Sequence, residues 1–102
     1  MHEGNIERTN EEWLSELDRV ADALDLDAET RTVAEDVFLS SVPEAERSKR
    51  ATLAASVYAA GLVAGDQRSQ GAVAEAADVS RITIQGRWKA LLETAGLDAP
   101  DW

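Results

Sequence analysis

The stretch that decides the fold is VAEAADVSRITIQGRWKAL, residues 73–91. Its small and apolar residues are spaced like a helix-turn-helix, in which two helices meet at a tight turn. Ala74 is the small residue that lets the helices approach, and Asp78 stands where the turn usually takes glycine. Asp tolerates the left-handed backbone of such a turn better than most residues. The inward-facing apolar residues are predicted to be Val73, Ala77, Val79, Ile84 and Trp88.

The outer face of the second helix of this motif is the face that enters a DNA major groove in such proteins. Residues 80–91 carry three basic side chains and no acidic one. Gln can bind adenine with both ends of its amide, Arg can bind guanine or phosphate, and an apolar side chain can touch the thymine methyl group. The candidate DNA-binding residues are therefore Arg81, Ile82, Gln85, Gly86, Arg87 and Lys89.

The rest of the chain also has helical periodicity. We predict a helix that follows Asn10 as its N-cap, a second helix capped by Asp27, and a third that runs from near Glu44 to Val63 and stops at Gly65. Apolar residues surround the third helix, so it is expected to be central. Ser69 and Ser80 are the predicted caps of helices 70–77 and 81–94. Because no segment alternates with the period of a strand, the fold class is all-α with five helices.

The ends of the chain differ from its middle. Residues 1–9 are polar and lack periodicity, while Gly96 and Pro100 follow the last predicted helix. We therefore expect a loose N-terminal segment (1–9), one domain (10–95) and a C-terminal tail (96–102).

Charge is unevenly distributed along the chain. The formal net charge is −10; residues 1–46 hold 14 acidic and 3 basic side chains, and residues 47–102 hold 6 acidic and 7 basic ones. A DNA-binding protein gains affinity from Lys and Arg contacts to phosphates, and here the acidic excess is in the half that lacks the motif. Such a composition is typical of proteins from a multimolar-salt cytoplasm. An ordinary acidic domain is the alternative.

Several function classes have no support in the sequence. The chain has no cysteine and a single histidine, His2, near the start, so disulfides, thiolate zinc sites and cysteine nucleophiles are excluded. No phosphate-binding loop and no nucleophile–base pair is recognisable, so we expect neither an enzyme nor a cofactor. The most apolar segment, residues 51–65, is shorter than the roughly 20 residues that span a bilayer, and no signal segment is visible. A cytoplasmic protein without a membrane partner is expected.

Residues 47–91 resemble one cyclin-like repeat of archaeal transcription factor B, the counterpart of eukaryotic TFIIB. The matching pieces are LAASVYAAGL after a basic lead, RSQGAVAEAADVS against the family's R-T-Q-x-x-V-A-x-x-A-x-V-T, and ITIQGRWKAL against V-T-I-R-x-R-Y-K-E-L. The first two predicted helices match only in number and placement. The resemblance implies a five-helix cyclin-like repeat with a C-terminal helix-turn-helix, and the composition suggests a haloarchaeal type.

In that family, the helix-turn-helix of the second repeat reads the promoter element beside the TATA box, and the repeats hold the TATA-binding protein. The resemblance thus implies double-stranded promoter DNA as a partner, together with TATA-binding protein or other transcription machinery. Ile82 stands where the family has Val, and Gln85 where it has Arg, which exchanges a guanine-type reader for an adenine-type one. The three basic residues of residues 80–91 would contact phosphates or orient the helix.

A full family member has two repeats and an N-terminal zinc ribbon that recruits polymerase. This sequence has one repeat and no cysteine. The resemblance therefore implies a stand-alone regulator, a competitor of the full factor, or one half of a homodimer that rebuilds the two-repeat arrangement.

Two functions remain open on sequence grounds. The first is a DNA-binding transcription regulator that reads duplex DNA with the fifth helix, which its three basic residues favour. The second is a cyclin-like module that binds a protein of the transcription machinery without reading DNA, in a groove beside the third helix lined by Tyr58. Gln85 and Gly86 favour the second function, because they replace longer side chains of the family.

Overall fold

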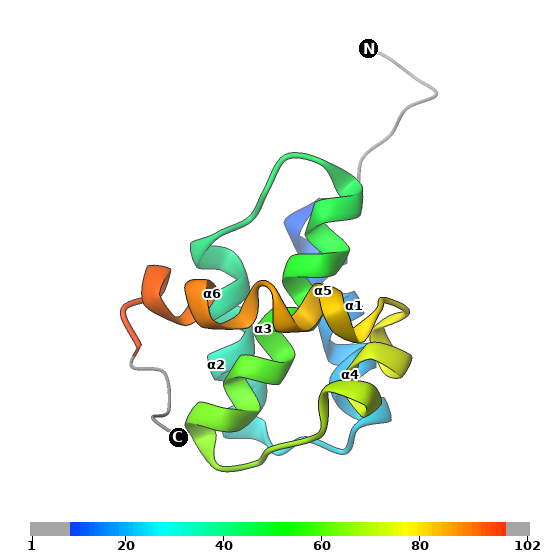
Figure 1. Cartoon of the computed structure of the whole chain (residues 1–102), viewed down its shortest axis with the longest axis vertical. Coiled ribbons are helices and arrows are strands. Elements are labelled where there is room, and N and C mark those ends of the chain that lie inside the picture. The colour runs from blue at the N-terminus through cyan, green and yellow to red at the C-terminus, as the bar shows by residue number, and fades with distance from the viewer. Residues whose placement is uncertain (1–8, 98–102) are drawn as a thin grey trace.

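The helix α3 (Glu46–Ala64) is the element around which the other helices pack. In this computed structural model, which describes residues 9–97, α3 contacts each of the other helices. Figure 1 shows α5 and α6 crossing in front of it. The helices are α1 (Asn10–Ala23), α2 (Ala28–Ser40), α3, α4 (Gln70–Ala77), α5 (Arg81–Gln85) and α6 (Trp88–Thr94). The predicted all-α class is confirmed, and α5 and α6 together occupy the place of the predicted fifth helix.

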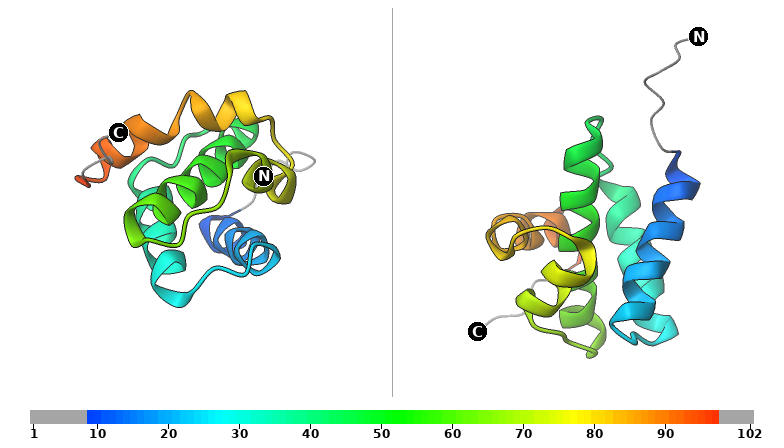
Figure 2. Two further views of the ribbon diagram at one scale, coloured as in Figure 1. Left: turned by 60° about the horizontal axis from the view of Figure 1, so that its bottom comes forward. Right: turned by 90° about the vertical axis from the view of Figure 1, so that its right-hand side faces the viewer.

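The acidic helix α1 lies on the far side of α3 from α5 and α6 (Figure 2, right), whereas the acidic helix α2 packs against α3 and also contacts α6. α1 contacts α2, α3 and α4 but neither α5 nor α6. The central position of α3 follows from its sequence, in which every residue from Ala51 to Gly61 is buried. Many of these residues are Ala, whose short side chain lets helices approach from all sides. The predicted central position of this helix is confirmed.

The two ends of α3 are set by different backbone features. The helix begins at Glu46 and not near Glu44, because the chain is still extended at Ala45 (φ −76°, ψ 134°). At its other end Gly65 adopts a left-handed conformation, as predicted from its position. Just before that end, a Cβ on Gly61 would lie 2.9 Å from the carbonyl oxygen of Asp66. The absence of a side chain at Gly61 therefore lets the chain turn back closely.

The cap of α1 is Thr9, and the prediction of Asn10 was wrong. Thr9 Oγ1 accepts a hydrogen bond from the Glu12 backbone N–H (3.1 Å), and Glu12 Oε1 accepts one from the Thr9 N–H (2.8 Å). This reciprocal capping box requires an acidic residue three positions after the cap, which Thr9 has. The N-cap of α2 is Asp27, as predicted, whose Oδ1 accepts from the N–H of Thr30 (2.8 Å).

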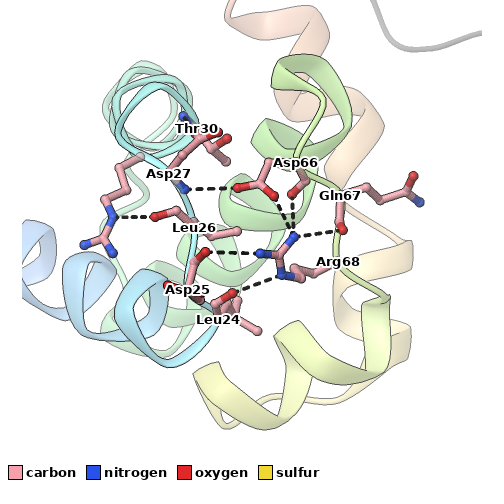
Figure 3. Close-up of polar contacts among 9 residues, drawn as sticks. Leu24, Asp25, Leu26, Asp27, Thr30, Asp66, Gln67 and Arg68 are labelled. Carbon is pink, nitrogen blue, oxygen red and sulfur yellow. Dashed lines mark hydrogen bonds and ion pairs between the residues drawn. The ribbon is translucent and has the colours of Figure 1, made fainter.

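The α1–α2 loop and the α3–α4 loop are fastened together by Arg68 (Figure 3). Its guanidinium donates to the carbonyl oxygens of Leu24 (3.0 Å) and Asp25 (3.1 Å), and to Oδ1 of Asp66 (2.7 Å). Oδ2 of Asp66 accepts from the backbone N–H of Asp27 (3.0 Å). The Asp27 N–H, with the Arg68 guanidinium, lowers the pKa of the Asp66 carboxyl. These contacts fix the start of α4 relative to the acidic helices.

The predicted segment 1–9 lies outside the described residues except for Thr9. Of the predicted tail 96–102, only Gly96 and Leu97 are described; Leu97 packs against the core, and its N–H donates to the Leu92 carbonyl oxygen (2.9 Å). Over residues 9–97, no helix has the length and apolar character that crossing a bilayer requires.

Candidate nucleic-acid interface

The helices α4 and α5 are joined by a tight turn at residues 78–80, where the sequence predicted the turn of a helix-turn-helix. Asp78 has a left-handed backbone (φ 62°, ψ 49°), as predicted for the turn position. The N–H of Val79 donates to the carbonyl oxygen of Ala74 (3.0 Å), and Ala74 is buried where the helices meet. Ser80 then caps α5, because its Oγ accepts from the N–H of Thr83 (3.1 Å). The turn therefore fixes the direction in which α5 leaves α4.

The inner side of α5 and α6 is anchored to α3. Ile84 is fully buried, and Trp88 is 8% exposed. The Trp88 ring meets Tyr58 of α3 edge-on, with ring centroids 5.7 Å apart and planes at 74°. Leu91 and Leu92 are also buried. The predicted core-facing residues of this segment are confirmed, and an edge-to-face aromatic pair of this kind favours one orientation of the segment on α3.

The predicted helix 81–94 is interrupted at Gly86 and Arg87. The N–H of Arg87 bonds to the carbonyl of Ile84 three residues back, at 3.1 Å, and Arg87 itself leaves the helical region (φ −126°, ψ −28°). Glycine has one of the lowest helix propensities of all residues, which permits the break. As a result α5 has five residues, and α6 begins again at Trp88.

The six candidate DNA-binding residues are all exposed, but they do not share one surface. Ile82, at 83% exposure, lies three residues before Gln85, so the two are neighbours on the outer side of α5. Arg81 lies against the start of α4, since a Cβ on Gly71 would be 3.5 Å from its Cδ. Arg87 instead lines a groove at the side of α5. Gly86 marks the break, and Lys89 lies beyond it in the first turn of α6.

Eight of the nine Lys and Arg side chains of residues 9–97 divide into two sets, and the ninth, Lys49, is buried. Four arginines form ion pairs with carboxylates: Arg19, Arg31, Arg50 and Arg68. Within residues 9–97, four other cations make neither an ion pair nor a hydrogen bond through their side chains: Arg47, Arg81, Arg87 and Lys89. Three of these are predicted site residues, and Arg47 lies at the start of α3. The positive charge that remains available to a ligand is therefore concentrated at α5, α6 and the neighbouring end of α3.

A clamp from the acidic side holds the end of α4. The Glu16 carboxylate accepts from Arg19 (2.7 Å) and from Arg50 (3.0 Å). Arg19 also donates to the carbonyl oxygen of Ala76 (3.2 Å), and Arg50 to that of Ala77 (3.3 Å). Hydrogen bonds from Arg19 and then Arg50 lower the pKa of Glu16 to about 2. Two positive charges thus stand at the negative end of the α4 dipole.

Sequence reasoning missed this clamp because its members are far apart along the chain. Glu16 and Arg19 are three residues apart on one helix, but Arg50 lies on another helix, 34 positions from Glu16. A single positional clue exists, since Arg50 belongs to the basic segment RSKR that leads into α3.

The groove beside α3 is at its N-terminal end, and the prediction that Tyr58 lines it was wrong. Tyr58 is 8% exposed because Trp88 covers it. The groove has a volume of about 670 Å³. It runs between the first turn of α3 and the α4–α5 turn, and Trp13 lies in its wall with the Arg50 guanidinium 5.4 Å from its ring centroid. Its charged residues are Glu46, Arg47, Arg50, Asp78 and Arg87.

Comparison with known proteins places this geometry in a family. The family described as "Transcription factor TFIIB repeat" matches residues 7–94 of this chain. The chain belongs to the TFIIB repeat family. The match confirms the predicted resemblance and extends it to the first two helices of this TFIIB repeat.

Individual relatives of this TFIIB repeat are initiation factors. Transcription initiation factor IIB 2 of Thermococcus kodakarensis is 32% identical over 87 residues, which are 82% of this chain and 28% of the relative. Transcription initiation factor IIB of Pyrococcus horikoshii is 39% identical over 54 residues, 53% of this chain and 18% of the relative. Transcription initiation factor IIB 1 of Thermoplasma volcanium is 47% identical over 45 residues, 44% and 14% of the two chains. The TFIIB repeat thus spans less than a third of these relatives.

No group of three or more His, Cys, Asp or Glu side chains among the described residues is arranged to hold a metal ion.

Proposed function

We propose that this TFIIB repeat is a DNA-binding regulator of transcription that reads duplex promoter DNA with α5. The observation that carries the proposal is the division of the cations. Arg81, Arg87 and Lys89 are exposed and make no ion pair within residues 9–97, whereas the arginines of the acidic side are neutralised by carboxylates. Unpaired cations on two successive helices suit a polyanion, because each phosphate contact releases counterions.

Each of the six candidate residues of α5, the break and α6 has a role in this proposal. Ile82 touches a thymine methyl group, and Gln85 reads a base edge in the major groove. Arg81, Arg87 and Lys89 contact phosphates and set the register of the protein on the duplex. Gly86 adds no side chain between the backbone and the DNA. The contact of Ile82 with a thymine methyl group would explain why this apolar side chain is 83% exposed on the five-residue helix α5.

The net charge of −10 is compatible with this function because of where the acids lie. α1 is on the far side of α3 from α5 (Figure 2), and α2 contacts α3 and α6 but not α5. At molar salt the screening length is only about 3 Å, so repulsion between these helices and the DNA is short-ranged. The relatives are transcription initiation factors, and the proposal accordingly includes TATA-binding protein as the protein that holds this repeat beside the TATA box.

The test is an NMR titration of the labelled protein in molar KCl with a duplex that carries a TATA box and its upstream flank. We expect shifts concentrated at Arg81, Ile82, Gln85 and Lys89, and weaker binding as salt is added. Arg81→Ala should weaken binding, whereas the control Arg31→Ala should not, because Arg31 is paired with Asp22 on the acidic side. If the α5 amides stay still while the protein remains folded, DNA reading by α5 is wrong.

A second candidate function is favoured by the groove beside α3. Its lining carries groups of both charge signs, a mixture that suits a protein segment better than a phosphate chain. In this case the repeat binds TATA-binding protein without reading DNA. The pair of changes Arg81→Ala and Gln85→Ala then leaves binding to TATA-binding protein intact, while Arg47→Glu in the groove weakens it.

A further inference from the structure

The amide side chains of Gln70 and Gln85 are joined by a hydrogen bond between two successive helices. Nε2 of Gln70, the first residue of α4, donates to Oε1 of Gln85, the last residue of α5, at 2.5 Å. Gln85 is exposed and Gln70 is half-buried. One member of the pair is therefore a candidate DNA-binding residue, and the other lies outside the six candidates.

The bond leaves Gln85 with every group that adenine requires. An amide oxygen has two lone pairs, and Gln70 occupies one of them. The second lone pair can accept from adenine N6, while Nε2 of Gln85 donates to adenine N7. The hydrogen bond from Gln70 and the two bonds to adenine can therefore exist together.

The bond restricts the freedom of the Gln85 amide. An unrestrained glutamine samples many rotamers and loses that freedom when it binds. A glutamine that can turn can also point its NH₂ group at guanine, whose O6 and N7 are both acceptors. When Oε1 is held in place, the amide presents one acceptor and one donor side by side, and guanine would bring O6 against Oε1. Restraint by Gln70 therefore favours adenine over guanine.

Gln70 is itself held in place, as a residue that orients another must be. The Oγ of Ser69 accepts from the N–H of Ala72 (3.0 Å) and caps α4 at this turn. Arg68, two residues before Gln70, is bound to carbonyl oxygens of the α1–α2 loop. Gln70 thus projects from a fixed turn and not from a free loop.

We infer that Gln70 is a positioning residue for base recognition, which holds the Gln85 amide in the orientation that binds adenine. The inference rests on the proposed function, because it requires α5 to enter a major groove. It adds a determinant of base preference on α4, a helix that contributes none of the six candidate residues.

The test selects duplexes from a pool with a TATA box and a randomised upstream flank, and the bound fraction is sequenced. The unmodified protein should enrich A·T over G·C at one position of the flank, and Gln85→Ala should remove that preference. Gln70→Ala should lower the same preference roughly two- to tenfold, which corresponds to the cost of ordering one side chain at an interface. Preferences at the other positions should stay unchanged, because Gln70 acts through Gln85.

Gln67→Ala is the matched control. The exposed Gln67 side chain points away from Arg68 in Figure 3 and makes no hydrogen bond within residues 9–97, so this variant should keep the preference of the unmodified protein. If Gln70→Ala weakens the binding of all duplexes equally and leaves the A·T preference unchanged, the positioning role is overturned, since a purely structural residue or a phosphate contact behaves in this way.

A measurement without DNA tests the pair itself. The Nε2 side-chain resonances of Gln70 should shift in Gln85→Ala and stay in place in Gln67→Ala. If they do not move in Gln85→Ala, the pair does not form in solution and the inference is overturned.

The outcomes separate this inference from the proposed function. An A·T preference that is lost in Gln85→Ala but unchanged in Gln70→Ala would overturn the role of Gln70 and leave the proposed function standing. The same holds if the preference that depends on Gln85 is for G·C. Selection of no duplex by the unmodified protein would overturn the proposed function, and this inference with it, even if the resonances report the pair.

Discussion

The guanidinium of Arg50 donates to the Glu16 carboxylate at 3.0 Å and joins the central helix α3 to the acidic helix α1 directly beside the end of α4. The same guanidinium reaches the last carbonyl of α4, at Ala77. Helix α1 is therefore part of the support of the helix-turn-helix, although it lies far from the proposed DNA face.

This support should be lost in acid. Because the pKa of Glu16 is lowered from 4.5 to about 2 in the folded protein, its contribution to stability is present above the unfolded pKa and disappears as the pH falls through about 2. We expect Glu16→Gln to reduce the free energy of unfolding at pH 7 by about 1–2 kcal/mol after solvent screening. Denaturant melts of both proteins between pH 6 and pH 2 should converge as the pH falls. Glu11→Gln, an exposed control, should show the same dependence of unfolding free energy on pH as the unmodified protein. If Glu16→Gln instead differs from the unmodified protein by the same unfolding free energy at every pH, the Glu16 carboxylate does not cause the loss of stability in acid.

Gly61 should not accept a side chain. In the middle of a helix, Ala is normally favoured over Gly by about 1 kcal/mol. At this position, however, the new Cβ would lie 2.9 Å from the backbone oxygen of Asp66, and a backbone atom cannot move aside cheaply. We expect Gly61→Ala to lower the free energy of unfolding by about 1–3 kcal/mol, measured by urea denaturation. An increase in stability would mean that the α3–α4 loop moves away readily.

Gly86→Ala should change the affinity for DNA without lowering the stability of the fold. Gly86 has a helix-compatible backbone (φ −81°), and a Cβ there meets only ordinary van der Waals contact at 3.5 Å from the Ile82 oxygen. Unfolding free energy should stay constant or rise by up to about 1 kcal/mol. DNA affinity should fall, because a longer α5 redirects Arg87. Far-ultraviolet circular dichroism and a DNA titration on the same sample test both statements, and unchanged affinity with increased helicity would remove any role for the break.

Asp78→Gly should stabilise the turn. Asp78 has a left-handed backbone at φ 62°, which costs an L-residue roughly 1 kcal/mol and glycine little. A rise in the thermal unfolding midpoint is expected, with the chemical shifts of α5 unchanged. A lower unfolding midpoint would show that the electrostatic attraction between the Asp78 carboxylate and Arg19 outweighs the cost of the left-handed backbone.

The order and type of the elements were predictable because they depend on local chemistry. Helix caps such as Ser69, Asp27 and Ser80 act within three residues, and the apolar periodicity of residues 73–92 specifies what faces inward. The wrong predictions have physical reasons as well. Thr9 was missed because a reciprocal cap depends on Glu12 as well as on the cap residue, and the break at Gly86 was missed because the apolar spacing continues across it.

The candidate site was only partly predictable. Exposure of Arg81, Ile82 and Lys89 follows from helical periodicity, and it was predicted. Which cations are neutralised does not follow, since Arg50 meets Glu16 and Arg68 meets Asp66 only after the chain has folded. The burial of Tyr58 likewise depends on Trp88, thirty positions away in the sequence.

The break between α5 and α6 has an evolutionary consequence. The hydrophobic anchors Trp88, Leu91 and Leu92 belong to α6, whereas α5 contributes one buried residue, Ile84. Four of the five α5 positions can therefore vary without disturbing the core. A lineage of such repeats can acquire new binding preferences by point mutation while every intermediate still folds.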